Sequence, residues 1–235
     1  MSATSTRRVV RLYALRHGEP ERTDLFYGHH DVALSCRGRE QAAGQAAVLS
    51  SAPLHAVYTS DLTRAAYGAH AVAEPHGLTP TVDVGLREMS LGQLENVPHA
   101  EAATRYPDVA KRSYGAMLDY RMPGGGESVR DVAARVLPVV NAAVLAHAFD
   151  AAPSSVSDDP KRPYAPGIVV YAHNTVTRLL LSCAAGMGPA GYFAFTQRFG
   201  ALNRVDLPVV GGRVAWEDAS IAYANRDAGW SRAGS

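Results

Sequence analysis

The sequence predicts an α/β protein, a three-layer α/β/α sandwich around a mostly parallel central sheet. Strand-like segments alternate along the chain with helix-like segments, which is the order that builds parallel sheets. The strand-like segments are mostly apolar, as is typical of strands covered on both faces. With 235 residues, of which 47% are hydrophobic and 19% charged, the chain can bury a large core without disulfides or a structural metal.

Local signals place each element in chain order. Ser35 is a suitable N-cap for one helix, and Ser60 or Asp61 for the next. Ser128 followed by Asp131 resembles a capping box, in which each residue's side chain accepts from the other's backbone amide. The predicted elements are a strand at 9–15, a helix at 37–50, a strand at 56–59, a helix ending near 74, an edge strand at 81–84, a helix at 100–106, a helix from Ser128 to about 147, a strand at 168–172, a helix at 175–185, and a hairpin of 205–210 and 213–216 around two glycines.

These elements are expected to form a single domain over residues 9–225, between an N-terminal tail at 1–8 and a C-terminal tail at 226–235. Residues 150–167 contain four prolines and several serines, so they are predicted to form an exposed loop. No internal repeat and no interdomain linker is visible.

Composition excludes several classes of protein. A net charge of +1 argues against a nucleic-acid binder, because such proteins usually carry a basic excess. No apolar run approaches the roughly 18 residues of a membrane span, and no signal peptide precedes the first strand. Cys36 and Cys183 lack metal-ligand spacing and make no disulfide framework. We therefore expect a cytoplasmic protein without a membrane or nucleic-acid partner; the oligomeric state is left open.

Polar side chains gather where predicted strands end. Arg16 and His17 follow the first strand, Arg64 lies just after the second, and His173 follows the strand at 168–172. Because ligands bind beyond the carboxyl ends of parallel strands, these four residues are expected to share one rim of the sheet. Two guanidinium groups suit a phosphate, and a neutral imidazole is a competent nucleophile. Glu88, which follows the edge strand, is the candidate proton donor.

Several of these residues also have simpler, structural interpretations. Glu88 could pair with neighbouring Arg87, and three other carboxylates (Glu19, Asp83 and Glu95) compete for the acid role. The adjacent His29 and His30 are expected in a solvated loop, not at a metal, because neighbouring side chains point in different directions. The glycines at 124–126 are expected in a turn, since no Lys-Ser/Thr of a Walker motif follows.

Taken in order, six segments resemble the motifs of the histidine phosphatase superfamily, the phosphoglycerate mutase-like proteins. The resemblance covers about residues 9–185. The segments are Arg16-His17-Gly18-Glu19; the Gly28, Asp31, Leu34-Ser35, Gly38, Gln41-Ala42 spacing; Ser60-Asp61-Leu62-Thr63-Arg64-Ala65; Leu86-Arg87-Glu88 with Gly92; Gly125-Gly126-Glu127-Ser128; and Val170-Tyr171-Ala172-His173.

The resemblance implies a role for each matching residue. His17 would attack phosphorus, while Arg16, Arg64 and His173 would hold the phosphoryl oxygens and Glu88 would act as general acid. It implies no cofactor and no metal ion, because the cationic side chains take the place of magnesium.

Two substrate-binding positions depart from the family pattern. Thr23 stands where the family often has Asn, and Asn174 stands where Gly usually follows the second histidine. In addition, Leu94-Glu95-Asn96 replaces a Trp-Glu-Gly.

The expected function is hydrolysis of a small phosphorylated metabolite through a phosphohistidine intermediate. One alternative is mutase-type phosphoryl transfer on phosphoglycerate, although the segment between Glu88 and the glycine-rich turn is short for a cofactor-dependent mutase. Another alternative is a non-catalytic phosphate-binding member of the fold.

Overall fold

The computed structural model describes residues 7–150 and 164–227. One sheet runs through the molecule, with the strand order β3-β2-β4-β1-β5-β6. Strand β7 also pairs with β5, along the same edge as β6. The first four strands in that order are parallel, and β5 turns the sheet antiparallel next to β1. The strands are β1 (Arg8–Arg16), β2 (Leu54–Thr59), β3 (Thr81–Val82), β4 (Gly167–Ala172), β5 (Leu202–Val210), β6 (Arg213–Val214) and β7 (Ser220–Arg226).

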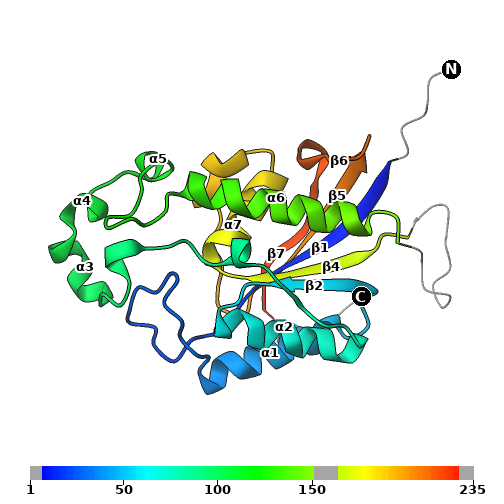
Figure 1. Cartoon of the computed structure of the whole chain (residues 1–235), viewed down its shortest axis with the longest axis horizontal. Helices are drawn as coiled ribbons and strands as arrows, with labels where there is room; N and C mark the ends of the chain where they lie inside the picture. Colours follow the sequence, from blue (N-terminus) through cyan, green and yellow to red (C-terminus); the bar gives the residue numbers. More distant parts are fainter. Residues whose placement is uncertain (1–6, 151–163, 228–235) are drawn as a thin grey trace.

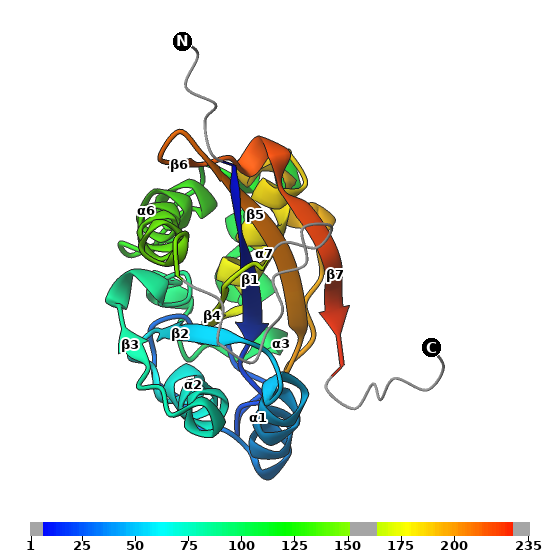
Figure 2. The ribbon, with the colours of Figure 1, turned by 90° about the vertical axis from the view of Figure 1, so that its right-hand side faces the viewer.

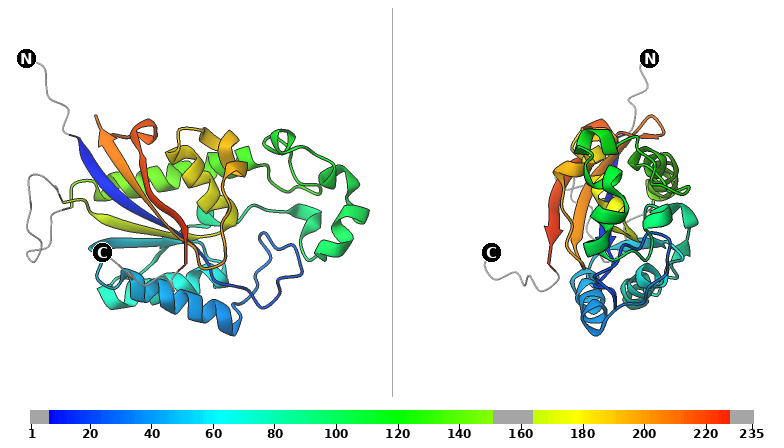
Figure 3. Two further views of the ribbon diagram at one scale, coloured as in Figure 1. Left: turned by 180° about the vertical axis from the view of Figure 1, so that it is seen from behind. Right: turned by 90° about the vertical axis from the view of Figure 1, so that its left-hand side faces the viewer.

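Helices cover both faces of this sheet (Figure 1). On one face lie α1 (Cys36–Leu49) and α2 (Thr63–Ala73), and on the other lie α6 (Val129–His147) and α7 (Asn174–Ala184). The view from behind shows the same three layers (Figure 3). The predicted α/β/α sandwich is therefore confirmed.

Each central strand divides its side chains between two cores. In β1, Val10, Leu12 and Ala14 pack toward α6 and α7, while Tyr13 and Leu15 pack toward α1 and α2. The same division holds in β4, because successive side chains of a strand point to opposite faces. Both faces of β1 and β4 are thus buried, which explains why the sequences of these strands are apolar instead of alternating.

The predicted helix caps are confirmed at two helices and wrong at a third. The Ser35 side chain accepts from the Gly38 amide at the start of α1, and Ser128 and Asp131 form the capping box of α6. At α2 the N-cap residue is Leu62, and the capping oxygen comes from Asp31, which accepts from the Thr63 amide at 2.9 Å. A cap supplied by a distant loop leaves no local signal.

The C-terminal segment contains a strand that the sequence interpretation missed. The predicted hairpin of β5 and β6 is present, and its turn glycine Gly212 has φ 77°. After this hairpin, β7 pairs antiparallel with β5 along its length, from Ser220 to Arg226. Figure 2 shows β1, β5 and β7 side by side. Half-exposed β7 alternates exposed and partly buried residues, so it lacks the apolar run of the central strands.

The predicted loop at 150–167 lies largely outside the described residues. Its last part differs from the prediction, because Ala165 is buried and Gly167 already pairs with β1. Gly167 fits there because a Cβ would lie 2.7 Å from the Pro53 carbonyl oxygen.

Short helices lie beyond the carboxyl ends of the strands, at the left of Figure 1. We call this segment, residues 92–117, the cap. Of its helices only α3 (His99–Arg105) was predicted, since a helix of three or four residues has almost no periodicity to detect. The cap contains η3 (Gly92–Leu94), α3 (His99–Arg105), α4 (Pro107–Ala110) and α5 (Tyr114–Met117), and the remaining 3-10 helices are η1 (Glu74–His76), η2 (Val84–Leu86), η4 (Gly188–Ala194) and η5 (Trp216–Asp218).

Among the helices in the described part of the chain, none combines the length and apolarity required to cross a bilayer.

Candidate active site

His17 lies directly beyond β1 and is held by the neighbouring strand. Its backbone amide donates to the Ala172 carbonyl of β4 at 3.0 Å, and its side chain is 2% exposed. Its Nδ1 lies 2.7 Å from the Gly18 carbonyl oxygen. A carbonyl can only accept, so Nδ1 carries the proton and Nε2 keeps its lone pair. The nitrogen that could attack an electrophile is therefore Nε2.

His173 follows β4 and lies edge-on to His17, with 5.2 Å between the ring centroids. A hydrogen bond of 2.7 Å joins its Nε2 to Ser60 Oγ, which in turn accepts from the Leu62 amide at 3.3 Å. When the Ser60 hydroxyl donates to Nε2, neutral His173 carries its proton on Nδ1. That N–H is buried and has no partner among the described residues.

Two arginines flank the histidines. Arg64, in the first turn of α2, is fully buried and donates to the Gly28 carbonyl at 2.7 Å and the His30 carbonyl at 3.0 Å. Arg16 donates to the Gln197 carbonyl, and its guanidinium lies 4.0 Å from the centre of the Phe199 ring. These contacts fix both guanidinium groups while leaving donors unused.

Unpaired buried donors concentrate at this rim. In residues 7–150 and 164–227, four buried side-chain nitrogens lack a partner, and three of them are Arg16 Nε, Arg64 Nε and His173 Nδ1. A buried donor without a partner is costly, so such groups cluster where a ligand supplies the acceptors. Three donors around one imidazole fit a compact oxyanion such as phosphate.

Burial and charge keep both imidazoles neutral. Burial lowers the pKa of His17 well below its ordinary value of 6.5, and the nearby Arg64 and Arg16 lower it further. The pKa of His173 is lowered well below 6.5 by burial and then by Arg64, His17 and Arg16. His17 is therefore a neutral imidazole at neutral pH, with the lone pair of Nε2 free for attack, as a nucleophile requires.

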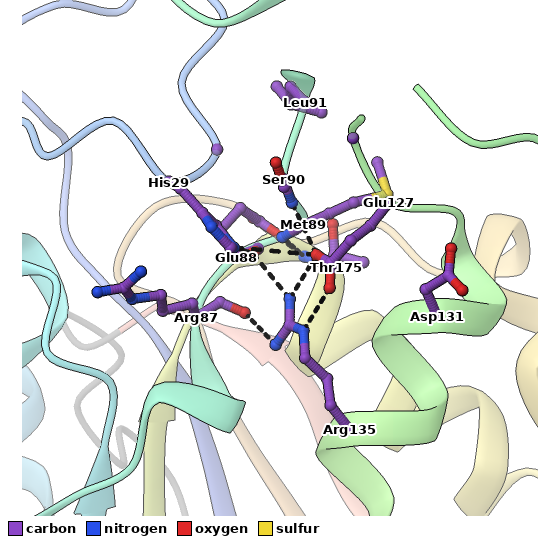
Figure 4. Close-up of polar contacts among 12 residues, drawn as sticks. His29, Arg87, Glu88, Met89, Ser90, Leu91, Glu127, Asp131, Arg135 and Thr175 are labelled. Atoms are coloured by element: carbon purple, nitrogen blue, oxygen red, sulfur yellow. Dashed lines mark hydrogen bonds and ion pairs between the residues drawn. The ribbon is translucent and has the colours of Figure 1, made fainter. Parts of the chain in front are cut away.

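Glu88 lies in the segment after η2, and its carboxylate contacts the first turn of α7, which begins directly after His173. Its carboxylate accepts from the Thr175 amide, at 3.1 and 3.2 Å, and from its neighbour Met89 at 2.8 Å (Figure 4). The alternative pairing with Arg87 is wrong, since the Arg87 guanidinium binds Asp61. The Glu88 carboxylate is thus held by backbone amides and has no Lys or Arg partner among the described residues.

The three competing carboxylates form hydrogen bonds elsewhere in the structure. Glu19 accepts from the Ser35 hydroxyl, and Asp83 accepts from the Gly85 amide at the start of η2. Glu95 accepts from the amides of residues 29, 30 and 91, so it shapes the loop whose carbonyls bind Arg64. These contacts leave Glu88 as the best-placed acid.

Sequence reasoning missed the clamp that holds the Glu88 backbone. Arg135 of α6 donates to the carbonyls of Gly85 and Arg87, at 2.7 and 2.8 Å, and to the Glu88 carbonyl at 2.8 Å. It also forms an ion pair with Glu127, which accepts from the Ser90 amide at 2.8 Å (Figure 4). Burial alone would raise the pKa of Glu127, but Arg135 and the Ser90 amide hold it below its ordinary value.

His29 lies in a loop, as expected, but its side chain is only 32% exposed and also belongs to this network. Its Nε2 lies 2.9 Å from the Glu88 carbonyl oxygen, to which it donates (Figure 4). His30 is exposed, as expected. Within the described residues, no three His, Cys, Asp or Glu side chains are arranged to hold a metal ion.

The two substrate-binding positions that depart from the family pattern differ in placement. Asn174 opens α7 directly after His173 and lines a cavity of about 440 Å³ that also contacts Glu88. Thr23 is exposed, and no hydrogen bond links its side chain to the other described site residues. Its role in substrate binding stays a prediction.

Residues 12–216 match the histidine phosphatase superfamily (branch 1). The chain belongs to this family. A glucosyl-3-phosphoglycerate phosphatase from Mycolicibacterium vanbaalenii is 34% identical over 187 residues, covering 77% of this chain and 76% of the relative. A 2,3-bisphosphoglycerate-dependent phosphoglycerate mutase from Azorhizobium caulinodans is 36% identical over 138 residues, covering 54% of this chain and 65% of that protein.

A solved structure of a mycobacterial glucosyl-3-phosphoglycerate phosphatase in complex with inorganic phosphate superposes with a TM-score of 0.74 at 28% identity, covering 94% of this chain and 100% of that chain. Histidine phosphatases act through a phosphohistidine and need no metal ion. The predictions of the family, of its fold and of a metal-independent phosphatase are confirmed by these relatives.

Proposed function

We propose that the chain hydrolyses phosphate monoesters with His17 as the nucleophile. Arg16, Arg64 and His173 bind the three non-bridging oxygens, and Glu88 is the general acid. The observation that carries this assignment is the set of three unpaired buried donors around a neutral imidazole. The non-bridging oxygens of a phosphoryl group would supply acceptors for these donors.

The reaction proceeds in two displacements. His17 Nε2 attacks phosphorus, the P–N bond forms, and the P–O bond to the alcohol breaks as Glu88 gives its proton to the leaving oxygen. Water then attacks the phosphohistidine, its proton passes to Glu88, and the P–N bond breaks to release inorganic phosphate. The fixed guanidinium groups stabilise the charge that develops on the phosphoryl oxygens in both steps.

The test measures phosphate release from 4-nitrophenyl phosphate by the wild type and by His17→Asn. We expect turnover that persists in EDTA and is inhibited by vanadate, and a loss of at least roughly 10³-fold in the variant. The exposed His30 provides the matched control, His30→Asn, which should keep wild-type turnover. Wild-type protein that is folded but inactive would favour the non-catalytic alternative.

The mutase alternative predicts phosphate exchange on phosphoglycerate in place of net release. Its support is the similarity to phosphoglycerate mutases, which covers about half of this chain. Incubation of the enzyme with labelled 3-phosphoglycerate separates the two: a phosphatase releases inorganic phosphate, and a mutase yields the 2-phospho isomer.

Glucosyl-3-phosphoglycerate is the first specific substrate to try, because relatives that cover most of the chain carry that name. We also propose that the enzyme works in the cytoplasm. That proposal agrees with the two cysteines being free thiols, exposed Cys36 and buried Cys183.

A further inference from the structure

The cavity beside Glu88 lies where the alcohol of a phosphate ester must go. Glu88, Asn174 and Thr175 form its inner end, next to His173. Most of the remaining wall comes from η3, α3, α4 and α5 of the cap, and it is completed by Phe26, Met89, Leu91, Met122 and Tyr192. A phosphoryl group bound between the histidines directs its leaving oxygen toward Glu88, so the group attached to that oxygen enters this cavity.

The wall of this cavity is apolar over most of its extent. Ten of the sixteen residues that line it are Ala, Val, Leu, Met or Phe, drawn from the cap and from segments beside it. The Tyr106 hydroxyl already donates to the Gln93 carbonyl at 2.8 Å, and the Tyr192 hydroxyl accepts from Arg178 at 3.1 Å. The other polar residues of the lining are Glu88, His99, Asn174 and Thr175, which are few beside the ten apolar side chains.

The charges of the lining residues also favour an uncharged, apolar ligand. No Lys or Arg is among the described residues that line the cavity, and its one carboxylate is Glu88. A glycerate carboxylate placed there would lose its hydration and find no Lys or Arg; the His99 imidazole is the one basic side chain of the lining, and Glu88 would be a second carboxylate nearby. Burial of an unpaired charge is costly, so such a ligand is disfavoured.

Resting on the proposed phosphatase activity, we propose that the preferred substrates are phosphate monoesters of largely apolar alcohols, aliphatic or aromatic, of about six to ten carbon atoms. A cavity of about 440 Å³ accommodates a chain or ring of that size. The proposed specificity thus differs from the one that the relatives' names suggest. Those names refer to glucosyl-3-phosphoglycerate, which combines a sugar with a carboxylate.

The experiment compares kcat/KM for hexyl phosphate and sorbitol 6-phosphate, two six-carbon esters of primary alcohols. Hydroxyl groups lower the pKa of an alcohol, so the polyol is the better leaving group and the chemistry alone favours sorbitol 6-phosphate. We expect the opposite order, with hexyl phosphate faster by on the order of tenfold or more. 3-Phosphoglycerate and glucosyl-3-phosphoglycerate complete the panel and should rank below hexyl phosphate.

A pair of variants in α3 tests the location. Ala102 lines the cavity, while exposed Thr104 lies two residues later and does not line it. Ala102→Leu should lower kcat/KM for hexyl phosphate by roughly 10-fold and leave ethyl phosphate unchanged, because the small ester does not reach the cap. Thr104→Leu should change neither.

The outcomes separate this proposal from the proposed function. Equal or higher kcat/KM for the polyol ester or for glucosyl-3-phosphoglycerate, in an enzyme that still depends on His17, overturns the apolar specificity alone. Absence of turnover on every ester contradicts the phosphatase proposal itself. If Ala102→Leu does not fold, the wild-type ranking of the four esters still decides.

Discussion

Residue by residue, the site depends on imidazoles that stay neutral and on a carboxylate held next to them. Burial and two guanidinium groups lower the pKa of His17, and the Gly18 carbonyl fixes its proton on Nδ1. The Glu88 carboxylate is oriented by the backbone amides of Thr175 and Met89. These local contacts suit His17 to the role of nucleophile and Glu88 to the role of acid.

The acid role of Glu88 should depend on the leaving group. An alkoxide must be protonated as it departs, whereas nitrophenolate leaves without a proton. Glu88→Gln keeps the shape and removes the ionisable proton. We expect histidine phosphorylation by hexyl phosphate to slow by on the order of 10²–10⁴-fold, and by 4-nitrophenyl phosphate far less.

Rapid quench must be used for this comparison, because Glu88 also acts in the dephosphorylation that both substrates share. Equal losses with the two esters would remove Glu88 from the acid role. Glu19→Gln serves as the matched control, since that carboxylate contacts the Ser35 hydroxyl.

Among the elements, the long helix α6 holds the acid in place through Arg135. The forked guanidinium reaches three backbone carbonyls and Glu127 at once, which a lysine ammonium cannot do. The segment it holds, residues 85–90, has no regular structure after η2 that would fix Glu88 by itself.

Arg135→Lys should therefore behave as a weaker form of Glu88→Gln. We expect kcat for hexyl phosphate to fall by roughly 10- to 100-fold through misplacement of Glu88, with a smaller loss for 4-nitrophenyl phosphate. Arg130→Lys in the same helix alters an exposed ion pair with Asp119 and should be silent. A uniform loss on both esters would indicate a general structural effect and not positioning of the acid.

At the scale of the whole molecule, the sequence predicted those features that leave a pattern in neighbouring residues. The apolar β1 and β4 and the polar residues that follow them were predicted, because strand burial and strand ends have local signatures. The Arg135 clamp, the Asp31 cap of α2 and the apolar cavity were not, because each depends on segments distant in sequence. β7 was missed because its alternating, half-exposed pattern resembles a polar tail.

Folding stability should fall in acid because two neutral histidines are buried. Both folded-state pKa values are depressed below the ordinary 6.5, so this stability is fully present above pH 6.5 and is lost as the pH falls toward the folded-state pKa values. Well below pH 6.5 the free energy of unfolding should drop by about 1.4 kcal/mol per pH unit for each histidine.

Urea unfolding between pH 7.5 and 5 measures this dependence. His17→Asn should show a shallower decline than the wild type, while exposed His30→Asn should match the wild type. Parallel curves for wild type and His17→Asn would mean that His17 is not buried in its neutral form.

The central claim, that His17 carries the phosphoryl group, is tested most directly by trapping the intermediate. The wild type is mixed with 4-nitrophenyl phosphate bearing radiolabelled phosphorus, quenched in alkali within milliseconds, digested, and mapped by mass spectrometry. The account predicts acid-labile, alkali-stable label on His17 and none in His17→Asn. Label on His173, or turnover without any labelled histidine, would contradict it.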